Sequence, residues 1–432
     1  MSDKETPKIG LITAISIIVA SMIGTGVFTS LGFQVIGIKS VSALLMLWIA
    51  GGVVALCGAL SYAELAISMP RSGGEYRYLS NLYHPALGFL SGFVSSTLGF
   101  AGPVAFSSLA FGQYFSNLVA INPSILATII LVAVTVINIA SLKLGSRFQT
   151  IFTVINLSLI LIIVICGFIL PDHSHFQISF TKNDFTQMIS PDFFVSLVYV
   201  SFAYSGWNSA TYVAEEIKDP RKNLPRALFW GSFIVMILYL LLNFIFLYSS
   251  PIEQLNNQFQ VAFVAAENIF GKEGAVIIAA IISIGLVASI NSMMFTGPRV
   301  TKAIGQDFPI FNKLAHVNSK GSPIYAILLQ FLFALVLIHI FDPRQIMTYI
   351  GFTLSLFTTL SVAGVYLNLS KYPDNVSLNR SPWFLIVPAL FIVIELLMMV
   401  YLLIQDPAPP VYGFLTVLSG LIVYFLINKK QK

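Results

Sequence analysis

Two short stretches that contain glycine interrupt hydrophobic segments long enough to be membrane helices. The first reads SMIGTGVF at residues 21–28, and the second reads FAYSGWN at residues 202–208. Unwound backbone in hydrocarbon leaves N–H and C=O groups unpaired, so it is tolerated only where it lines a protein cavity or meets a ligand. The two breaks therefore indicate a transporter whose freed backbone groups bind the substrate.

The backbone groups at these breaks would bind opposite charges. The short helix that begins at Gly26 would present free N–H groups and a positive dipole end, which favour a carboxylate. The helix that ends near Ile23, and the carbonyl groups of residues 202–205, would present oxygens that favour an ammonium group. A free α-amino acid carries both groups on one carbon and is the simplest ligand. Close helix packing is the alternative for one GTG motif, but two paired breaks favour a site.

The elements that position these breaks are membrane helices. The chain has 432 residues, of which 57% are hydrophobic and 9% are charged, and this composition predicts an all-α integral membrane protein embedded in a lipid bilayer. A window of about 20 residues, the length of a membrane helix, predicts twelve spans. They cover residues 9–37, 41–67, 86–117, 122–141, 147–170, 190–215, 227–249, 274–299, 323–341, 343–369, 382–404 and 411–428. The first is too long for a signal peptide, so we expect it to remain as an anchor.

The basic residues predict the orientation of these spans. With a cytoplasmic N-terminus, 19 of the 23 Lys and Arg residues fall on the cytoplasmic side, where such residues accumulate. The exceptions are Lys39, Lys182, Lys272 and Arg344. We therefore expect a multi-pass protein of the plasma membrane with both termini in the cytoplasm. The net charge of +5 follows from this topology, and no basic patch remains for nucleic acid.

The broken spans are the first and the sixth, as expected for two inverted five-helix repeats. The repeats would cover residues 1–170 and 171–369, and residues 370–432 would hold two peripheral helices. The extracellular connection at residues 249–272 is either a lid or a plain surface loop.

Other functions find little support in the sequence. Both cysteines, Cys57 and Cys166, lie in predicted spans, so we expect no disulfide-linked partner subunit. No pore loop for a channel and no set of catalytic bases or metal ligands is visible, so we expect neither an enzyme nor a cofactor. A nutrient sensor built on a transporter fold remains an alternative.

At these residues the chain resembles the amino acid–polyamine–organocation superfamily, and most closely the L-type amino acid transporters and their bacterial relatives. The matching segments are IGTGVF in the first span, SYAELA at 61–66, PRSGGEYRYL at 70–79, FAYSGWNSATYVAEEIKDPRKNLPRA at 202–227 and SINSMMFTGPRV at 289–300. The resemblance covers almost the whole length. It implies two inverted five-helix repeats, two further helices and transport by alternating access.

The resemblance also assigns roles to residues at the breaks. The N–H groups of Thr25 and Gly26 would hold the substrate carboxylate, and Phe202 would close over the substrate as the outer gate. The remaining residues assigned to the substrate site are Met22, Ile23, Ala203, Ser205 and Trp207. The carbonyl groups of Ile23, Phe202 and Ser205, with that of Met22, would receive the amine.

One departure from the family bears on the coupling of transport to ions. Many members carry a lysine in the fifth span where this chain has Asn156, which excludes a mechanism with a titrating lysine at this position. Asn156, the carbonyl of Ala20 and the hydroxyl of Ser289 would either tie helices 1, 5 and 8 together or admit a cation. Exchange of amino acids is favoured over proton- or sodium-coupled uptake, because the spans offer no obvious proton relay.

The distribution of acidic residues bears on the substrate. Relatives that are selective for cationic amino acids also have asparagine at the position of Asn156, but a cationic side chain would need a carboxylate near the pocket. Spans 3, 8 and 10 contain none, and Glu395 in span 11 is expected to lie away from the core. Neutral substrates are therefore favoured, with a cationic amino acid transporter as the alternative. Ser205, where the family usually has glycine, favours small to medium side chains.

Overall fold

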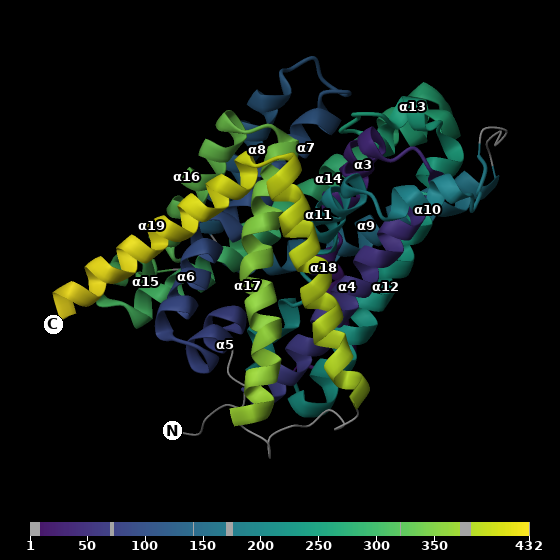
Figure 1. Cartoon of the computed structure of the whole chain (residues 1–432). Coiled ribbons are helices and arrows are strands. Elements are labelled where there is room, and N and C mark those ends of the chain that lie inside the picture. The colour runs from purple at the N-terminus through teal and green to yellow at the C-terminus, as the bar shows by residue number, and fades with distance from the viewer. Residues whose placement is uncertain are drawn as a thin grey trace.

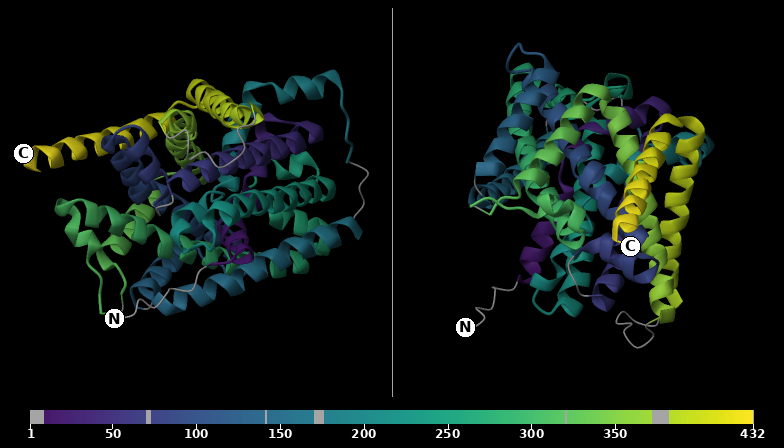
Figure 2. Two further views of the ribbon diagram at one scale, coloured as in Figure 1. Left: turned by 90° about the horizontal axis from the view of Figure 1, so that it is seen from below. Right: turned by 90° about the vertical axis from the view of Figure 1, so that its left-hand side faces the viewer.

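A computed structural model describes residues 9–69, 73–140, 142–169, 176–319, 321–371 and 382–431, and the side chains of 142–153, 382–384 and 428–431 are left aside. The predicted boundary at 170–171 and the first eight residues lie outside this part. The described chain is a bundle of helices without a strand (Figure 1). Figure 2 shows that the last helix runs along one edge of the bundle.

Each predicted span coincides with a helix or a run of consecutive helices. These are α1 (Leu11–Met22), α2 (Gly26–Thr29) and α3 (Leu31–Gly37); α4 (Val41–Ser68); α6 (Pro85–Val94), the π-helix η1 (Ser95–Gly99) and α7 (Ala101–Phe115); α8 (Pro123–Ala140); α9 (Leu142–Ile169); α11 (Pro191–Tyr204) and the 3-10 helix η2 (Ser209–Glu216); α12 (Pro220–Ser249); α14 (Val261–Asp307); α16 (Ile324–Ile340); α17 (Pro343–Lys371); α18 (Pro382–Gln405) and α19 (Ala408–Gln431). Short helices in the connections are α5 (Gly74–Leu82), α10 (Lys182–Met188), α13 (Ile252–Leu255), η3 (Pro309–Phe311) and α15 (Asn312–Ala315).

Length and composition alone support fewer crossings than twelve. Within the described residues, nine helices are long and apolar enough to cross a membrane, or ten if the bent pair at 182–216 is one span. Two further apolar helices, at 154–169 and 324–340, are shorter. The eighth span differs most from its prediction, because α14 begins at Val261 and contains a kink at Gly271, where φ is 73°. The predicted start at 274 therefore corresponds to the kink and not to the helix end.

Contacts between distant segments agree with the predicted order of crossings. The N–H of Ile9 donates to the carbonyl of Glu216 over 2.7 Å, so the start of α1 lies beside the end of η2. At the other end of α1–α3, the N–H groups of Lys39 and Ser40 donate to Oε1 of Gln187 over 2.9 and 3.0 Å. The prediction places six crossings between the first pair of segments and four between the second pair. An even number of crossings returns the chain to the same side of the membrane, so both contacts are compatible with the prediction.

A buried aromatic cluster holds the end of α1. The rings of Trp48 on α4, Tyr204 on α11 and Tyr239 on α12 lie 5.1–5.9 Å apart between centroids. The Tyr239 hydroxyl donates to the carbonyl of Met22 over 2.6 Å, and the Tyr204 hydroxyl donates to the carbonyl of Trp48 over 3.1 Å. Because these rings are fully buried, they fix the position at which α1 ends.

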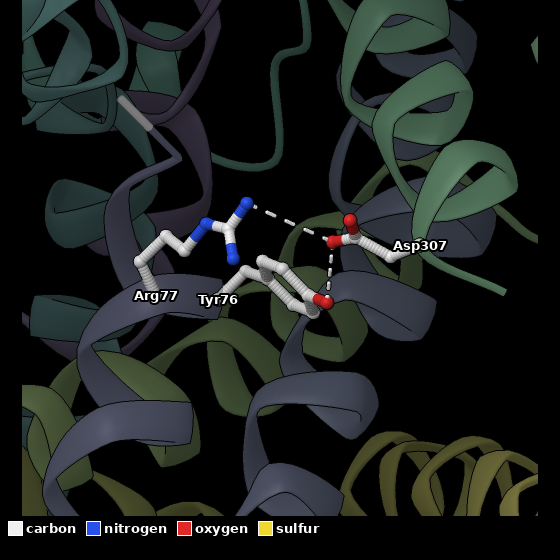
Figure 3. Close-up of polar contacts among 3 residues, drawn as sticks. All are labelled: Tyr76, Arg77 and Asp307. Atoms are coloured by element: carbon white, nitrogen blue, oxygen red, sulfur yellow. Dashed lines mark hydrogen bonds and ion pairs between the residues drawn. The ribbon is translucent and has the colours of Figure 1, made fainter. Parts of the chain in front are cut away.

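A polar contact fastens α5 to the end of α14 (Figure 3). The Tyr76 hydroxyl donates to Oδ2 of Asp307 over 2.7 Å, and Nη2 of Arg77 lies 3.8 Å from the same oxygen. The side chains of Arg77 and Asp307 are 40% and 34% exposed, so solvent screens this ion pair. The hydroxyl contributes the shorter of the two contacts.

We expect Tyr76→Phe to lower the free energy of unfolding by about 1 kcal/mol, the usual size of a hydrogen bond. Arg77→Gln should cost less than about 0.5 kcal/mol, because exposed ion pairs contribute little. Thermal unfolding of both purified variants in the same detergent measures the difference. The reverse order of effects would contradict the assignment of the tether to the hydroxyl.

Candidate functional site

The first break separates α1 from α2. Ile23 is extended (φ −72°, ψ 96°), and helical geometry resumes at Thr25. The hydroxyl of Tyr239 donates to the carbonyl of Met22. Among the described residues, the N–H groups of Thr25 and Gly26 donate to no other backbone group. The first break therefore has two free N–H donors at the start of α2.

A chain of hydroxyl groups crosses the bundle beside this break. Oγ1 of Thr25 lies 2.5 Å from Oγ of Ser107 on α7, which in turn lies 3.3 Å from Oγ of Ser289 on α14. Ser289 is thus linked to the first break through Ser107. This link had no signal in the sequence, because it depends on how α7 packs between the first break and α14.

Asn156 lies against α14 at Gly285, one turn before Ser289. The side chain is 7% exposed, and its Oδ1 has no hydrogen-bond partner. A Cβ atom at Gly285 would collide with this oxygen. No hydrogen bond joins Asn156 to Ala20 or Ser289 in the described part of the chain, so the tether through these three residues stays a prediction.

The second break lies directly beside the first. α11 ends at Tyr204, Ser205 is extended at ψ 149°, and Gly206 has φ 100°, a conformation that favours glycine. A Cβ at Gly206 would lie 2.6 Å from the carbonyl oxygen of Ser21. A Cβ at Gly26 would lie 2.6 Å from Cα of Ala203. Both glycines are therefore required for the two unwound segments to touch.

A cavity of about 170 Å³ opens beside the second break. Most of its wall comes from α11, α14, α17 and α18, together with η1, η2 and the residues that follow η1. Of the predicted site residues, Phe202, Ser205 and Trp207 line it. The others, Met22, Ile23, Thr25, Gly26 and Ala203, lie at the breaks but are absent from the described wall. The Met22 carbonyl, which was predicted to receive the amine, already accepts the hydroxyl of Tyr239.

Aromatic rings close the cavity at one end. The ring of Phe202 packs edge-on against Phe106 on α7, with 5.1 Å between centroids, and Phe106 packs against Phe259 at 5.5 Å. Phe259 also contacts Phe33 on α3 at 6.1 Å. Phe259 belongs to the 249–272 connection, and the N–H of Asn257 donates to the carbonyl of Gly32 over 2.9 Å. This connection therefore covers the end of the bundle where α3 and α13 lie (Figure 1).

The opposite end of the cavity carries a buried carboxyl that the sequence analysis did not place. Glu75 on α5 is 6% exposed and lines the cavity. It accepts hydrogen bonds from the Tyr62 hydroxyl over 2.8 Å and from Nδ2 of Asn208 over 3.2 Å. Burial raises the pKa of Glu75 to about 7, although both hydrogen bonds lower it. Trp207 packs against Tyr62 at 4.8 Å and so couples the second break to this carboxyl.

The expectation that Glu395 lies away from the core is wrong. Its side chain is 3% exposed and lines the cavity, because α18 packs against α4, α11 and α17. Oε1 accepts a hydrogen bond from Ser201 over 3.4 Å. An acidic residue inside an apolar span is itself a signal of a functional site. The expectation was wrong because span 11 follows the two predicted repeats in the sequence, and such a span was expected to lie at the periphery.

Comparisons with known proteins identify the family of this chain. A family model described as "Amino acid permease" matches residues 9–427. The "Large neutral amino acids transporter small subunit 2" of Mus musculus is 32% identical over 97% of this chain and 80% of its own length. The "Asc-type amino acid transporter 1" and "b(0,+)-type amino acid transporter 1" of Mus musculus are 29% and 28% identical over 97% of this chain, and over 81% and 87% of their own lengths.

Proposed function

The chain belongs to the amino acid permease family, and from this premise we propose that it exchanges neutral L-amino acids across the plasma membrane by alternating access. The observation that carries the proposal is the contact between two helix breaks beside a cavity. One break supplies free N–H groups at Thr25 and Gly26, and the other supplies carbonyl groups. Irregular backbone of this kind lines the midplane sites of secondary transporters.

The preference for neutral substrates rests on a relative, and the preference for small to medium side chains rests on Ser205. The name of the relative with 32% identity refers to large neutral amino acids. Ser205 lines the cavity and takes space that glycine would leave to the substrate, which favours small to medium side chains. The absence of a nearby carboxylate no longer supports this preference, because Glu75 and Glu395 both line the cavity.

In the proposed mechanism the substrate carboxylate binds at Thr25 and Gly26, and its amine binds the carbonyls of Ile23, Phe202 and Ser205. The Phe202 carbonyl already accepts the Ser205 N–H over 3.1 Å, so it would offer its second lone pair. Phe202 is the proposed outer gate, with its end of the cavity toward the outside and both termini in the cytoplasm. Residues 1–170 and 171–369 are the proposed inverted repeats, with 370–432 peripheral.

A disulfide to a partner subunit is not part of the proposal. The name of one relative describes a small subunit, which leaves assembly with another chain open for that protein. In this chain Cys57 lies buried in α4 and Cys166 lies in α9. Both positions are inside apolar helices, so any assembly would be non-covalent.

Cation-coupled uptake is the second candidate, and Asn156 is the observation that favours it. Its Oδ1 is buried without a partner near Ser289, and an unpaired amide oxygen would suit a cation. Exchange is placed first because no lysine occupies this position and the amide cannot carry a proton.

Uptake of labelled alanine into proteoliposomes tests the proposal. We expect rapid uptake into vesicles preloaded with amino acid and little into empty vesicles, with or without sodium and pH gradients. Gradient-driven accumulation in empty vesicles would instead establish the cation-coupled candidate. No uptake under any condition would contradict amino acid transport of this substrate class.

A further inference from the structure

The carboxyl of Glu395 lies in the cavity wall without a full set of partners. Oε1 has the long contact with Ser201, and Oε2 has no hydrogen-bond partner although the side chain is 3% exposed. A buried carboxylate with one oxygen left without a donor is costly, and in a membrane helix such a group is paired or neutral. The group therefore requires either a proton or a positive charge that arrives through the cavity.

The surroundings of Glu395 favour a positive charge in the cavity. From α11 and α17, the hydroxyls of Ser201 and Ser355 face the carboxyl, and no charged side chain of α4, α11, α17 or α19 interacts with it within the described residues. The cavity wall also contains Glu75 and Tyr212, but its described residues include no Lys, Arg or His. Seven serines and two threonines line the same wall, so donors and acceptors are available while positive charge is not.

The position of Glu395 relates this carboxyl to the substrate. Ser201, which donates to it, directly precedes Phe202 at the second break. α18 thus forms the part of the cavity wall next to the second break. Phe391, one turn earlier on α18, packs against Trp207 at 6.2 Å and keeps this helix in register with the break.

We propose that Glu395 is the counter-charge for a positively charged substrate side chain, so that the cavity accepts basic amino acids such as lysine besides neutral ones. This rests on the proposed use of the cavity as the amino acid site. A neutral substrate binds with Glu395 protonated. The ammonium group of a basic substrate displaces that proton, which leaves to the water of the cavity, and forms a charge-assisted hydrogen bond with the carboxylate.

Ligand-dependent thermal unfolding of the purified full-length protein in detergent tests the proposal without requiring transport. The apparent Kd of lysine is compared with that of norleucine, which has an uncharged side chain of similar length. For Glu395→Gln, the ratio of the lysine Kd to the norleucine Kd should rise by about tenfold or more, as expected for loss of a hydrogen bond to a charged group. Glu273→Gln, at an exposed carboxyl of α14, is the matched control and should leave the ratio unchanged.

The wild-type protein provides a second measurement if Glu395→Gln does not fold. Lowering the pH from 7.5 to 5.5 should raise the same ratio, because lysine stays charged while protonation removes the charge of the carboxylate.

A ratio that is unchanged by Glu395→Gln, or by pH in the wild type, overturns the proposal, and so does wild-type protein that binds norleucine but not lysine. If the wild type shows pH-driven alanine uptake and Glu395→Gln loses it with an unchanged ratio, Glu395 is a proton carrier instead. Failure of alanine exchange with intact lysine binding would refute the proposed function alone.

Discussion

Gly26→Ala is expected to lower alanine exchange by at least tenfold, whereas Gly24→Ala, two residues earlier, should lower it less than threefold. A Cβ at Gly26 would lie 2.6 Å from Cα and 2.8 Å from Cβ of Ala203. Backbone cannot move aside as a flexible side chain does, so the methyl group must push the two breaks apart, and overpacking of this kind costs about 1–3 kcal/mol. At Gly24 the nearest atom, Oγ of Ser289, would be 3.6 Å away, which is ordinary contact.

The measurement is the initial rate of labelled alanine exchange in proteoliposomes with matched amounts of folded protein. Size-exclusion profiles and thermal unfolding midpoints of both variants separate a loss of function from a loss of folding. Equal exchange by the two variants would show that close contact between Gly26 and Ala203 is not needed for transport. It would also remove the main support for a substrate site built from both breaks.

The breaks could be predicted from sequence because their cause is local. Glycine in a hydrophobic run can also serve close helix packing, but two glycine-containing interruptions five spans apart favour unwound backbone. In the structure Gly206 has a φ of 100°. The presence of glycine at this position is the only sign in the sequence of such a backbone conformation. Phe202 and Trp207 could be assigned to the cavity for the same reason, since they flank that glycine.

Glu395 and Glu75 could not be placed in this way, because their burial depends on contacts between helices far apart in the sequence. Span 11 follows the second repeat, so chain order suggested a peripheral helix. Its contacts with α4, α11 and α17 bring Glu395 to the cavity nonetheless. Glu75 lies in a connection, where a charged side chain is usually solvated, but Tyr62 and Asn208 enclose it. Both carboxyls therefore needed the tertiary structure.

Phe202→Ala is expected to lower alanine exchange by at least tenfold and to let labelled substrate leak from preloaded vesicles. The ring of Phe202 is 8% exposed and forms the boundary between the cavity and the stack of Phe106, Phe259 and Phe33. Removing a buried phenyl ring leaves a void and costs about 3–5 kcal/mol in packed cores. Here the void would connect the cavity with the end that the aromatic stack closes.

Phe111→Ala is the matched control for this prediction. Phe111 is also nearly buried and stacks on Phe115 at 5.1 Å, but it is absent from the described cavity wall. Its loss should reduce thermal stability by a similar amount while exchange and vesicle retention stay close to wild type. Exchange without leak in Phe202→Ala would show that the ring packs but does not gate. A leak of equal size in both variants would mean that lost stability, and not an opened boundary, lets the substrate escape.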